Sequence, residues 1–467
     1  MQKLNLTDTS WLLVESRETP MHIGTLSIFS LPKDAPDEFV QNTVAHLRDT
    51  RTFAPPWSLK LASGAIDKAI PNWVEDPHID MDYHFRHSAL PKPGGERELG
   101  VLISRLHSHQ LDLNRPLWEV HLIEGLEGNR MALYTKMHHS MIDGGSGVRL
   151  LCRIYSSDPS ARSMLPPWSV PPPASKDRAE VSEMAPLRAL LSQVRSGGRT
   201  SAALIKALGR MIEGSRSQES SLKVPFSAPS SALNTRIKGG ARRFATQQYE
   251  LAHIKSLAKA ADCTLNDIVL YLCGTAIRRF LGESYLSANA PLTAGIPVDV
   301  RPADGDQNMG NALSLMIASL GTDVADPLER LAAIKASTKE AKEHLQAMPR
   351  TALTQYMMMI MAPYMLQMMT GIGARTRPVF NIIISNVPGP RETLYFNGAK
   401  LEALYPVSLL AHGGALNITC LSYASTLNFG FTGCRDSLPH MQRLAVYTGD
   451  ALAELTELLR PATPDRA

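Results

Sequence analysis

A strand that stops at a pair of histidines constrains this chain more than any other stretch of its sequence. Residues 131–137 alternate as in a strand, residues 138–144 read His-His-Ser-Met-Ile-Asp-Gly, and residues 148–155 have the apolar spacing of a helix. Gly144 and Gly145 permit a sharp turn between the two elements. The sequence therefore predicts a strand, a tight turn and a helix, with the histidines where α/β proteins often carry out chemistry.

The length of 467 residues favours two domains over a single core. Strand and helix patterns alternate in both halves, which predicts a mixed α/β fold. Prolines at positions 159, 166, 167, 171, 172, 173 and 186 mark a composition shift. We therefore expect an N-terminal domain over 1–157, a Pro/Ser-rich linker over 158–239, and a C-terminal domain over 240–467.

The net charge of +4 gives no support to a nucleic-acid binder. The five cysteines form no Cys-x-x-Cys pair, which favours reduced thiols in the cytoplasm. No secretory signal is visible, and no uncharged apolar run reaches the roughly 18 residues that a spanning helix needs. Residues 187–212 form a basic amphipathic segment, which can rest on an anionic membrane or pack on its own protein.

The histidine pair offers one candidate base. Neighbouring strand residues point to opposite faces, so His138 and His139 cannot both face one crevice. A neutral imidazole can take a proton from a hydroxyl group, while Asp143 can hold a ring or fix the loop. A purely structural histidine pair is the alternative reading. A metal site is a weaker interpretation of the pair, because the sequence has no further cluster of His, Cys or Glu residues at the spacing of metal ligands.

The motif and its order along the chain resemble a known family. Residues 138–144 match the HHxxxDG motif of the CoA-dependent acyltransferase superfamily. Pro116-Leu117-Trp118, Asn266-Asp267 and the segment 386–390, which we expect to shape a loop, are similar to further motifs of one branch. That branch is the bacterial wax ester synthase/acyl-CoA:diacylglycerol acyltransferase family. The resemblance spans nearly the whole chain.

The resemblance implies two chloramphenicol-acetyltransferase-like domains, each a mixed β-sheet with flanking helices, and an active-site tunnel at their interface. His139 would be the general base, with support from His138, Asp143 and Gly144. Asn266 would donate to the oxyanion; the alternative is a residue merely favoured near a helix start. Arg301 is one candidate partner for Asp143.

Two regions are candidates for lining the tunnel. A methionine-rich run contains Met357, Ile360 and Met361, and methionine suits an adaptable pocket for a fatty chain. Trp118 is the second candidate. Simple core packing is the alternative for both.

The expected function is an O-acyltransferase that moves a fatty acyl group from acyl-CoA to a long-chain alcohol, to diacylglycerol, or to both. Acyl-CoA would be a substrate, so neither a cofactor nor a metal is expected. The expected partners are these lipids and a membrane or lipid-droplet surface, contacted peripherally from the cytoplasm. The alternatives are a relative with another alcohol or amine acceptor, and a non-catalytic lipid-binding protein.

Overall fold

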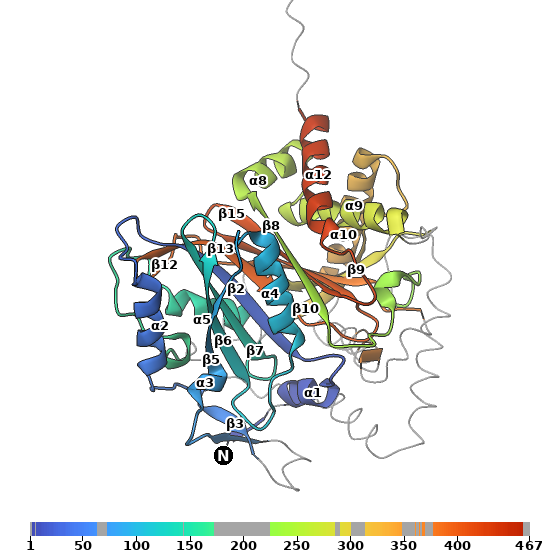
Figure 1. Cartoon of the computed structure of the whole chain (residues 1–467). Coiled ribbons are helices and arrows are strands. Elements are labelled where there is room, and N and C mark those ends of the chain that lie inside the picture. The colour runs from blue at the N-terminus through green and yellow to red at the C-terminus, as the bar shows by residue number, and fades with distance from the viewer. Residues whose placement is uncertain are drawn as a thin grey trace, which may run out of the picture.

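The computed structural model describes residues 2–4, 6–62, 72–142, 144–171, 225–284, 290–299, 313–347, 360, 364, 367–368 and 377–460. These residues form two six-stranded sheets, each with its own helices, and a small three-stranded sheet (Figure 1). Each large sheet has a separate apolar core. The mixed α/β architecture predicted from the sequence is confirmed.

The N-terminal sheet has the strand order β12-β13-β2-β7-β6-β5. Only β5 and β6 pair in parallel; the other neighbours are antiparallel. Gly128 and Asn129 adopt positive φ in the turn of the β6–β7 hairpin. The strands are β2 (His22–Ser30), β5 (Phe85–Ala89), β6 (Trp118–Leu126), β7 (Arg130–His138), β12 (Tyr395–Phe396) and β13 (Ala399–Val407).

Helices cover both faces of this sheet. α2 (Phe39–Asp49) and α5 (Gly144–Ile154) pack on one face, and α4 (Glu96–Ser108) packs on the other. The apolar residues of α4 recur at helical spacing and face the sheet, and Ile103 among them is fully buried. The smaller elements around the sheet are α1 (Leu6–Val14), α3 (Met81–His84), η1 (Pro167–Ser169), and the strands β1 (Gln2–Lys3), β3 (Leu59–Leu61) and β4 (Asn72–Glu75).

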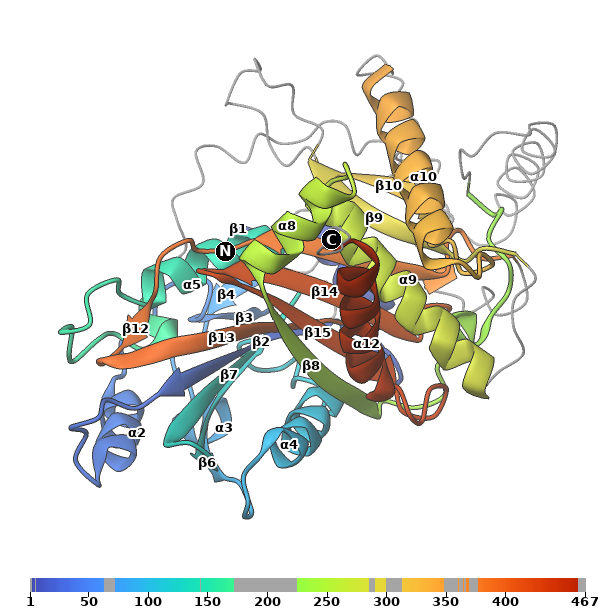
Figure 2. The same ribbon diagram turned by 90° about the horizontal axis from the view of Figure 1, so that it is seen from above.

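The C-terminal sheet has the strand order β10-β9-β11-β14-β15-β8, with β11 parallel to both of its neighbours. Four helices cover one of its faces, as Figure 2 shows from above. The strands are β8 (Arg242–Glu250), β9 (Thr293–Asp299), β10 (Leu313–Ser319), β11 (Ile382–Pro388), β14 (Leu416–Tyr423) and β15 (Thr426–Cys434). The helices are α8 (Leu251–Ala260), α9 (Leu265–Ser284), α10 (Pro327–Ala347) and α12 (Arg443–Leu458), and η4 (Ala232–Asn234) precedes them.

Hydrogen bonds join α4, which packs on the N-terminal sheet, to β8 of the C-terminal sheet. The hydroxyls of Ser104 and Ser108 on α4 accept hydrogen bonds from the backbone N–H groups of Phe244 (2.9 Å) and Arg242 (2.8 Å) on β8. Both bonds use the last turns of α4, where a serine hydroxyl can reach a neighbouring edge strand. The α4 helix therefore packs on the N-terminal sheet and is hydrogen-bonded to an edge strand of the C-terminal sheet.

The sheets do not follow the order of the chain. Residues 395–407 come late in the sequence, yet β13 pairs with β2 in the N-terminal sheet. The division of the chain into domains at residues 157 and 239 stays a prediction. The strand pairing shows in addition that residues 395–407 complete the N-terminal sheet. The expected loop at 386–390 is wrong in part, because β11 continues to Pro388. Most of the expected linker, including 187–212, lies outside the described residues.

Candidate active site

Backbone pairing places the two histidines at the end of β7. His138 is the last residue of β7 and pairs with His22 of β2. Its N–H donates to the carbonyl of Leu117 at 2.9 Å, and the N–H of His139 donates to the carbonyl of Met21 at 2.9 Å. The chain then turns, with the Met141 N–H bonded to the His138 carbonyl at 3.0 Å, and α5 begins at Gly144. The predicted strand, turn and helix are confirmed.

His138 is buried and its ring is held from two sides. Its Nδ1 accepts a hydrogen bond from the Ser140 N–H at 3.1 Å and lies 2.7 Å from the Ser140 hydroxyl. An Nδ1 that accepts from a backbone N–H leaves the proton of the neutral ring on Nε2. That Nε2 lies 3.5 Å from a carboxyl oxygen of Glu15. The ring is therefore fixed beneath the turn, an arrangement that suits a supporting residue.

His139 is partly buried and lies against an aromatic ring. Its imidazole stacks on the indole of Trp11 in α1, with ring centroids 4.2 Å apart and an interplanar angle of 28°. Trp11 also packs against an apolar cluster that joins the two halves of the chain. The members of this cluster, called the junction cluster below, are Trp11, Val14, Met21, Tyr364, Met368, Leu409 and Ala411. His139 thus lies where N-terminal and C-terminal segments meet.

Glu15 is a site residue that the sequence analysis missed. Its carboxyl group accepts a short hydrogen bond from the Met21 N–H and a second one, at 2.6 Å, from the side-chain amide of Gln110. The carbonyl of the same residue, Met21, accepts the hydrogen bond from the His139 N–H. Glu15 therefore fixes the position of Met21, the residue whose carbonyl accepts the His139 N–H. A lone glutamate after an apolar helix carries no local signal of this role.

A buried polar layer lies between β6, β7 and α4, on the face where His138 points. Glu119 Oε2 lies 2.9 Å from Lys136 Nζ and 3.2 Å from His121 Nε2. Burial alone would raise the pKa of Glu119, but the bonds from His121 and Lys136 outweigh it and lower that pKa to about 2. Burial lowers the pKa of Lys136, whose ammonium also donates to the carbonyls of Leu106 and His109. This layer ties the end of α4 to the sheet.

Two histidines of the same layer are kept neutral. Burial lowers the pKa of His107 to about 3, and burial followed by the nearby His107 and Lys136 lowers the pKa of His22 well below its usual value. His107 lies 2.8 Å from the Tyr134 hydroxyl and 3.0 Å from the Ser408 carbonyl. Because a carbonyl only accepts, Nε2 of His107 donates to Ser408 and Nδ1 accepts from Tyr134. The His107 ring thus links the two halves of the chain through Ser408, and the His22 ring bonds to the His107 carbonyl at 2.8 Å.

Asn266 and Asp267 open α9, and the structure separates their surroundings. Asp267 is buried; its carboxyl oxygens accept from the Thr264 N–H (2.8 Å), the Thr264 hydroxyl (2.7 Å) and the Thr338 hydroxyl (2.6 Å). The Asp267 N–H bonds back to the Thr264 hydroxyl at 3.2 Å, so Thr264 and Asp267 form a capping box. Asn266 is the second residue of the helix and is partly exposed. Asp267 explains the helix start, and the role of Asn266 stays a prediction.

The structure describes only some of the expected tunnel residues. Trp118 is fully buried among Trp57, Trp168 and His84, and its indole N–H donates to the Trp57 carbonyl at 2.8 Å. Ile360 is fully buried in a small cluster with Leu315, Ile317, Val379 and Phe380. Both surroundings are apolar or aromatic packing, and the tunnel assignment stays a prediction. Asp143, Arg301, Met357 and Met361 lie outside the described residues.

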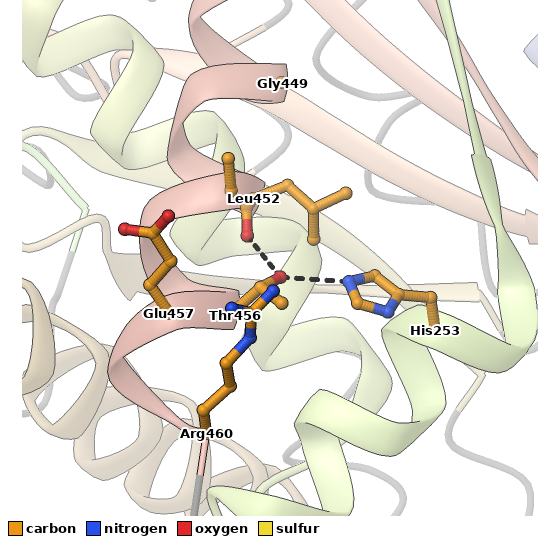
Figure 3. A pocket seen from close by; sticks show the side chains of 7 residues that line it. His253, Gly449, Leu452, Thr456, Glu457 and Arg460 are labelled. Carbon is orange, nitrogen blue, oxygen red and sulfur yellow. Dashed lines mark hydrogen bonds between the residues drawn. The ribbon is translucent and has the colours of Figure 1, made fainter.

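A hollow of about 320 Å³ lies between α8 and α12, away from the histidine pair (Figure 3). His253 Nε2 lies 2.9 Å from the Thr456 hydroxyl, which donates to the Leu452 carbonyl. The hydroxyl proton is thus used, so His253 must donate its own N–H to Thr456. The other residues that line the hollow are Gly449, Ala453, Glu457 and Arg460. This hollow lacks the strand-end geometry of the histidine pair.

The fold and the site together define the class of protein. The first condensation domain of the calcium-dependent antibiotic synthetase aligns with 99% of this chain and 97% of its own, at a TM-score of 0.55 and 17% identity. At this identity the likeness concerns the fold alone. The two sheets, with the histidine pair at the end of β7, give the chain the fold that its resemblance to CoA-dependent acyltransferases implied.

The chain belongs to the wax ester synthase/diacylglycerol acyltransferase family. Residues 4–269 match the model of that family's catalytic domain, and residues 309–456 match the model of its C-terminal domain. A putative diacylglycerol O-acyltransferase of Mycobacterium tuberculosis is 43% identical over 97% of both chains. The O-acyltransferase WSD of Acinetobacter baylyi is 38% identical over 96% of this chain and 95% of its own.

A solved structure supports the same assignment. The wax ester synthase/diacylglycerol acyltransferase of Marinobacter aquaeolei aligns with 98% of this chain and 100% of its own, at a TM-score of 0.81 and 37% identity. The family resemblance drawn from the sequence motifs is therefore confirmed, and the protein is an acyltransferase. In the described part of the chain, no helix has the length and apolar character that crossing a bilayer requires.

Proposed function

We propose that this protein transfers a fatty acyl group from acyl-CoA to the hydroxyl of a long-chain alcohol or of diacylglycerol, with His139 as the general base. The observation that carries this proposal is the position of His139. It follows β7 directly, its N–H is bonded to the Met21 carbonyl, and its ring lies against the junction cluster. Family membership and the names of the relatives supply the substrate classes.

The proposed reaction is a direct transfer. Neutral His139 removes the proton of the acceptor hydroxyl, and the oxygen attacks the thioester carbonyl. The tetrahedral intermediate collapses, the carbon–sulfur bond breaks, and protonated His139 returns its proton to the departing thiolate. Asn266 is proposed to donate to the oxyanion, where one such donor contributes about 2.7–4 kcal/mol. No covalent acyl-enzyme forms in this scheme.

The test is acceptor-dependent thiol release from palmitoyl-CoA, with hexadecanol and a diacylglycerol offered separately. We expect His139→Ala to lower kcat by about a thousandfold, and His138→Ala to act mainly through stability. His253→Ala is the matched control, because its imidazole is bonded to Thr456 in the hollow of Figure 3. Wild-type protein that releases no thiol with either acceptor would leave a lipid-binding protein or a transferase with another acceptor.

We also propose that the protein works at a membrane or lipid-droplet surface. Its proposed acceptors and products are poorly soluble in water, and Leu13 of α1, two residues beyond Trp11, is 53% exposed. An apolar side chain beside the site can enter the headgroup region. Flotation with phosphatidylglycerol vesicles tests this proposal: Leu13→Asp should reduce the bound fraction, and equal binding would contradict a role for this helix.

A further inference from the structure

The stack between Trp11 and His139 bears on the charge that His139 acquires during the reaction. The centroids of the two rings lie 4.2 Å apart at an interplanar angle of 28°, so the indole face covers the imidazole face. A cation within about 6 Å of an indole centroid is attracted by the negative face of the ring. Neutral imidazole lacks this attraction, while imidazolium gains it.

We infer that Trp11 is a positioning residue that holds the His139 ring and stabilises its protonated form. This inference rests on the proposed function, in which His139 is neutral before the reaction and cationic in the tetrahedral intermediate. An interaction that is stronger in the intermediate than in the ground state lowers the barrier. Stacking also covers only the face of the imidazole, so the indole does not block the ring edge that carries the nitrogen atoms.

The surroundings of Trp11 strengthen the interaction. Its neighbours Val14, Met21, Met368 and Ala411 are all buried, and they come from both halves of the chain. These four side chains shield part of the indole of Trp11, which is itself partly buried like His139, and cation–π attraction is larger where the partners are desolvated. The cluster also fixes where α1 lies, which in turn fixes the indole ring over His139.

Other titratable groups lie on the elements that meet here, and the experiment must keep them constant. Among the described residues they include Asp8 on α1, Glu15, Arg17 and Glu18 after it, His22 on β2, Lys136 and His138 on β7, Tyr364, and His412 beside Ala411. Substitutions at Trp11 leave all of these groups in place. A difference between two Trp11 variants therefore reports on the ring itself.

The experiment compares Trp11→Leu with Trp11→Phe in the full-length protein. Both substitutions keep an apolar side chain over His139, but only phenylalanine keeps an aromatic face. The readout is kcat/KM for the acceptor across pH, because activity rises as His139 loses its proton. We expect the acid limb to move to lower pH by about 0.5–1.5 units in Trp11→Leu and by less in Trp11→Phe.

A second readout separates stacking from packing. Trp11→Leu should lower kcat while the KM for palmitoyl-CoA changes less than twofold, and Trp11→Phe should recover most of the lost kcat. Val14→Ala is the control, because it removes a member of the junction cluster without removing the ring. It should lower the thermal midpoint and leave the acid limb in place.

The outcomes distinguish this inference from the proposed function. An acid limb at the same pH in wild type, Trp11→Leu and Trp11→Phe would overturn the role of Trp11, even with His139→Ala inactive. Equal kcat in the two variants would do the same. Activity that survives in His139→Ala would instead contradict the proposed base, and the inference would fail with it.

Discussion

A carboxyl oxygen of Glu15 lies 3.5 Å from Nε2 of His138, and both side chains are almost fully buried. The distance exceeds that of a normal hydrogen bond, so the contact is electrostatic. Glu15 also accepts the N–H of Met21, whose carbonyl accepts the N–H of His139. The Glu15 side chain thus faces His138, the supporting histidine. It also fixes Met21, whose carbonyl accepts the N–H of His139, the proposed base.

The first prediction concerns Glu15. Glu15→Gln keeps an oxygen in the place of Oε2, which accepts from Met21 and faces His138, but it removes the carboxylate charge and turns an amide N–H toward the side-chain amide of Gln110. Glu15→Ala removes both interactions and leaves the buried Met21 N–H without its acceptor, which costs about 1–3 kcal/mol. We expect kcat to fall in both variants, and the free energy of unfolding to fall further in Glu15→Ala. Denaturant unfolding and the thiol-release assay measure the two effects.

A surface carboxylate provides the control for Glu15. Glu343→Ala removes one partner of an exposed pair with Lys339, whose side chains are 63% and 72% accessible. Exposed pairs of this kind contribute little, so both readouts should stay at the wild-type level. Wild-type kcat in Glu15→Ala would show that the Met21 peptide keeps its position without the carboxyl group.

The second prediction concerns acid stability. The pKa of His107 is lowered to about 3 in the folded protein, while an unfolded histidine titrates near 6.5. Below pH 6.5 the unfolded chain binds the proton and the folded chain does not, so stability falls as the pH falls from 6.5 toward 3. At pH 5.5 this single group should cost about 1.4 kcal/mol relative to pH 7.5.

His107→Gln tests this prediction directly. Glutamine can donate to the Ser408 carbonyl and accept from the Tyr134 hydroxyl, but it does not titrate. The difference in unfolding free energy between pH 7.5 and pH 5.5 should therefore shrink by about 1.4 kcal/mol in the variant. An equal pH dependence in His107→Gln and wild type would show that His107 is not the group responsible.

Local sequence patterns were sufficient for the elements that carry the histidine motif. The alternation before His138 and the helical spacing after Gly147 predicted β7 and α5 within a few residues, because each pattern reflects burial on one face. Strand alternation also predicted that the side chains of the two histidines lie in different surroundings. His138 is buried beside Glu15, while His139 lies past the strand end against Trp11.

Relationships between distant segments could not be predicted in the same way. β13 was missed although residues 399–403 alternate in burial, because Pro406 argues against a strand and its partner β2 lies far away in the sequence. The roles of Glu15 and Trp11 likewise depend on contacts that only the folded chain creates. The family resemblance supplied the choice of His139, which alternation alone left open.

The third prediction concerns the close approach of the two sheets at Gly430. A Cβ atom added to Gly430 of β15 would lie 1.8 Å from the carbonyl oxygen of Pro406 in β13. Backbone cannot yield as a flexible side chain can, so Gly430→Ala must push the two sheets apart. We expect a loss of about 3 kcal/mol in unfolding free energy, measured by denaturant titration.

Gly282 in α9 is the matched control for Gly430. A Cβ atom there would meet nothing within 4 Å, and alanine is favoured over glycine inside a helix by about 1 kcal/mol. Gly282→Ala should therefore leave stability unchanged or raise it. Similar destabilisation by both substitutions would mean that the approach of β13 to β15 is not tightly packed.

The last prediction separates the two residues that open α9. Asp267→Ala removes the carboxyl group that accepts from Thr264 and Thr338, so α9 loses one half of its capping box and the Thr338 hydroxyl loses its acceptor. We expect a loss of about 2–3 kcal/mol in unfolding free energy. Asn266→Ala should leave the thermal midpoint within a degree or two of wild type. Its kcat should fall by about a hundredfold or more, because the proposed oxyanion donor is gone. A stable Asn266→Ala variant with wild-type kcat would leave Asn266 as a helix-start residue only, and the oxyanion would need another donor.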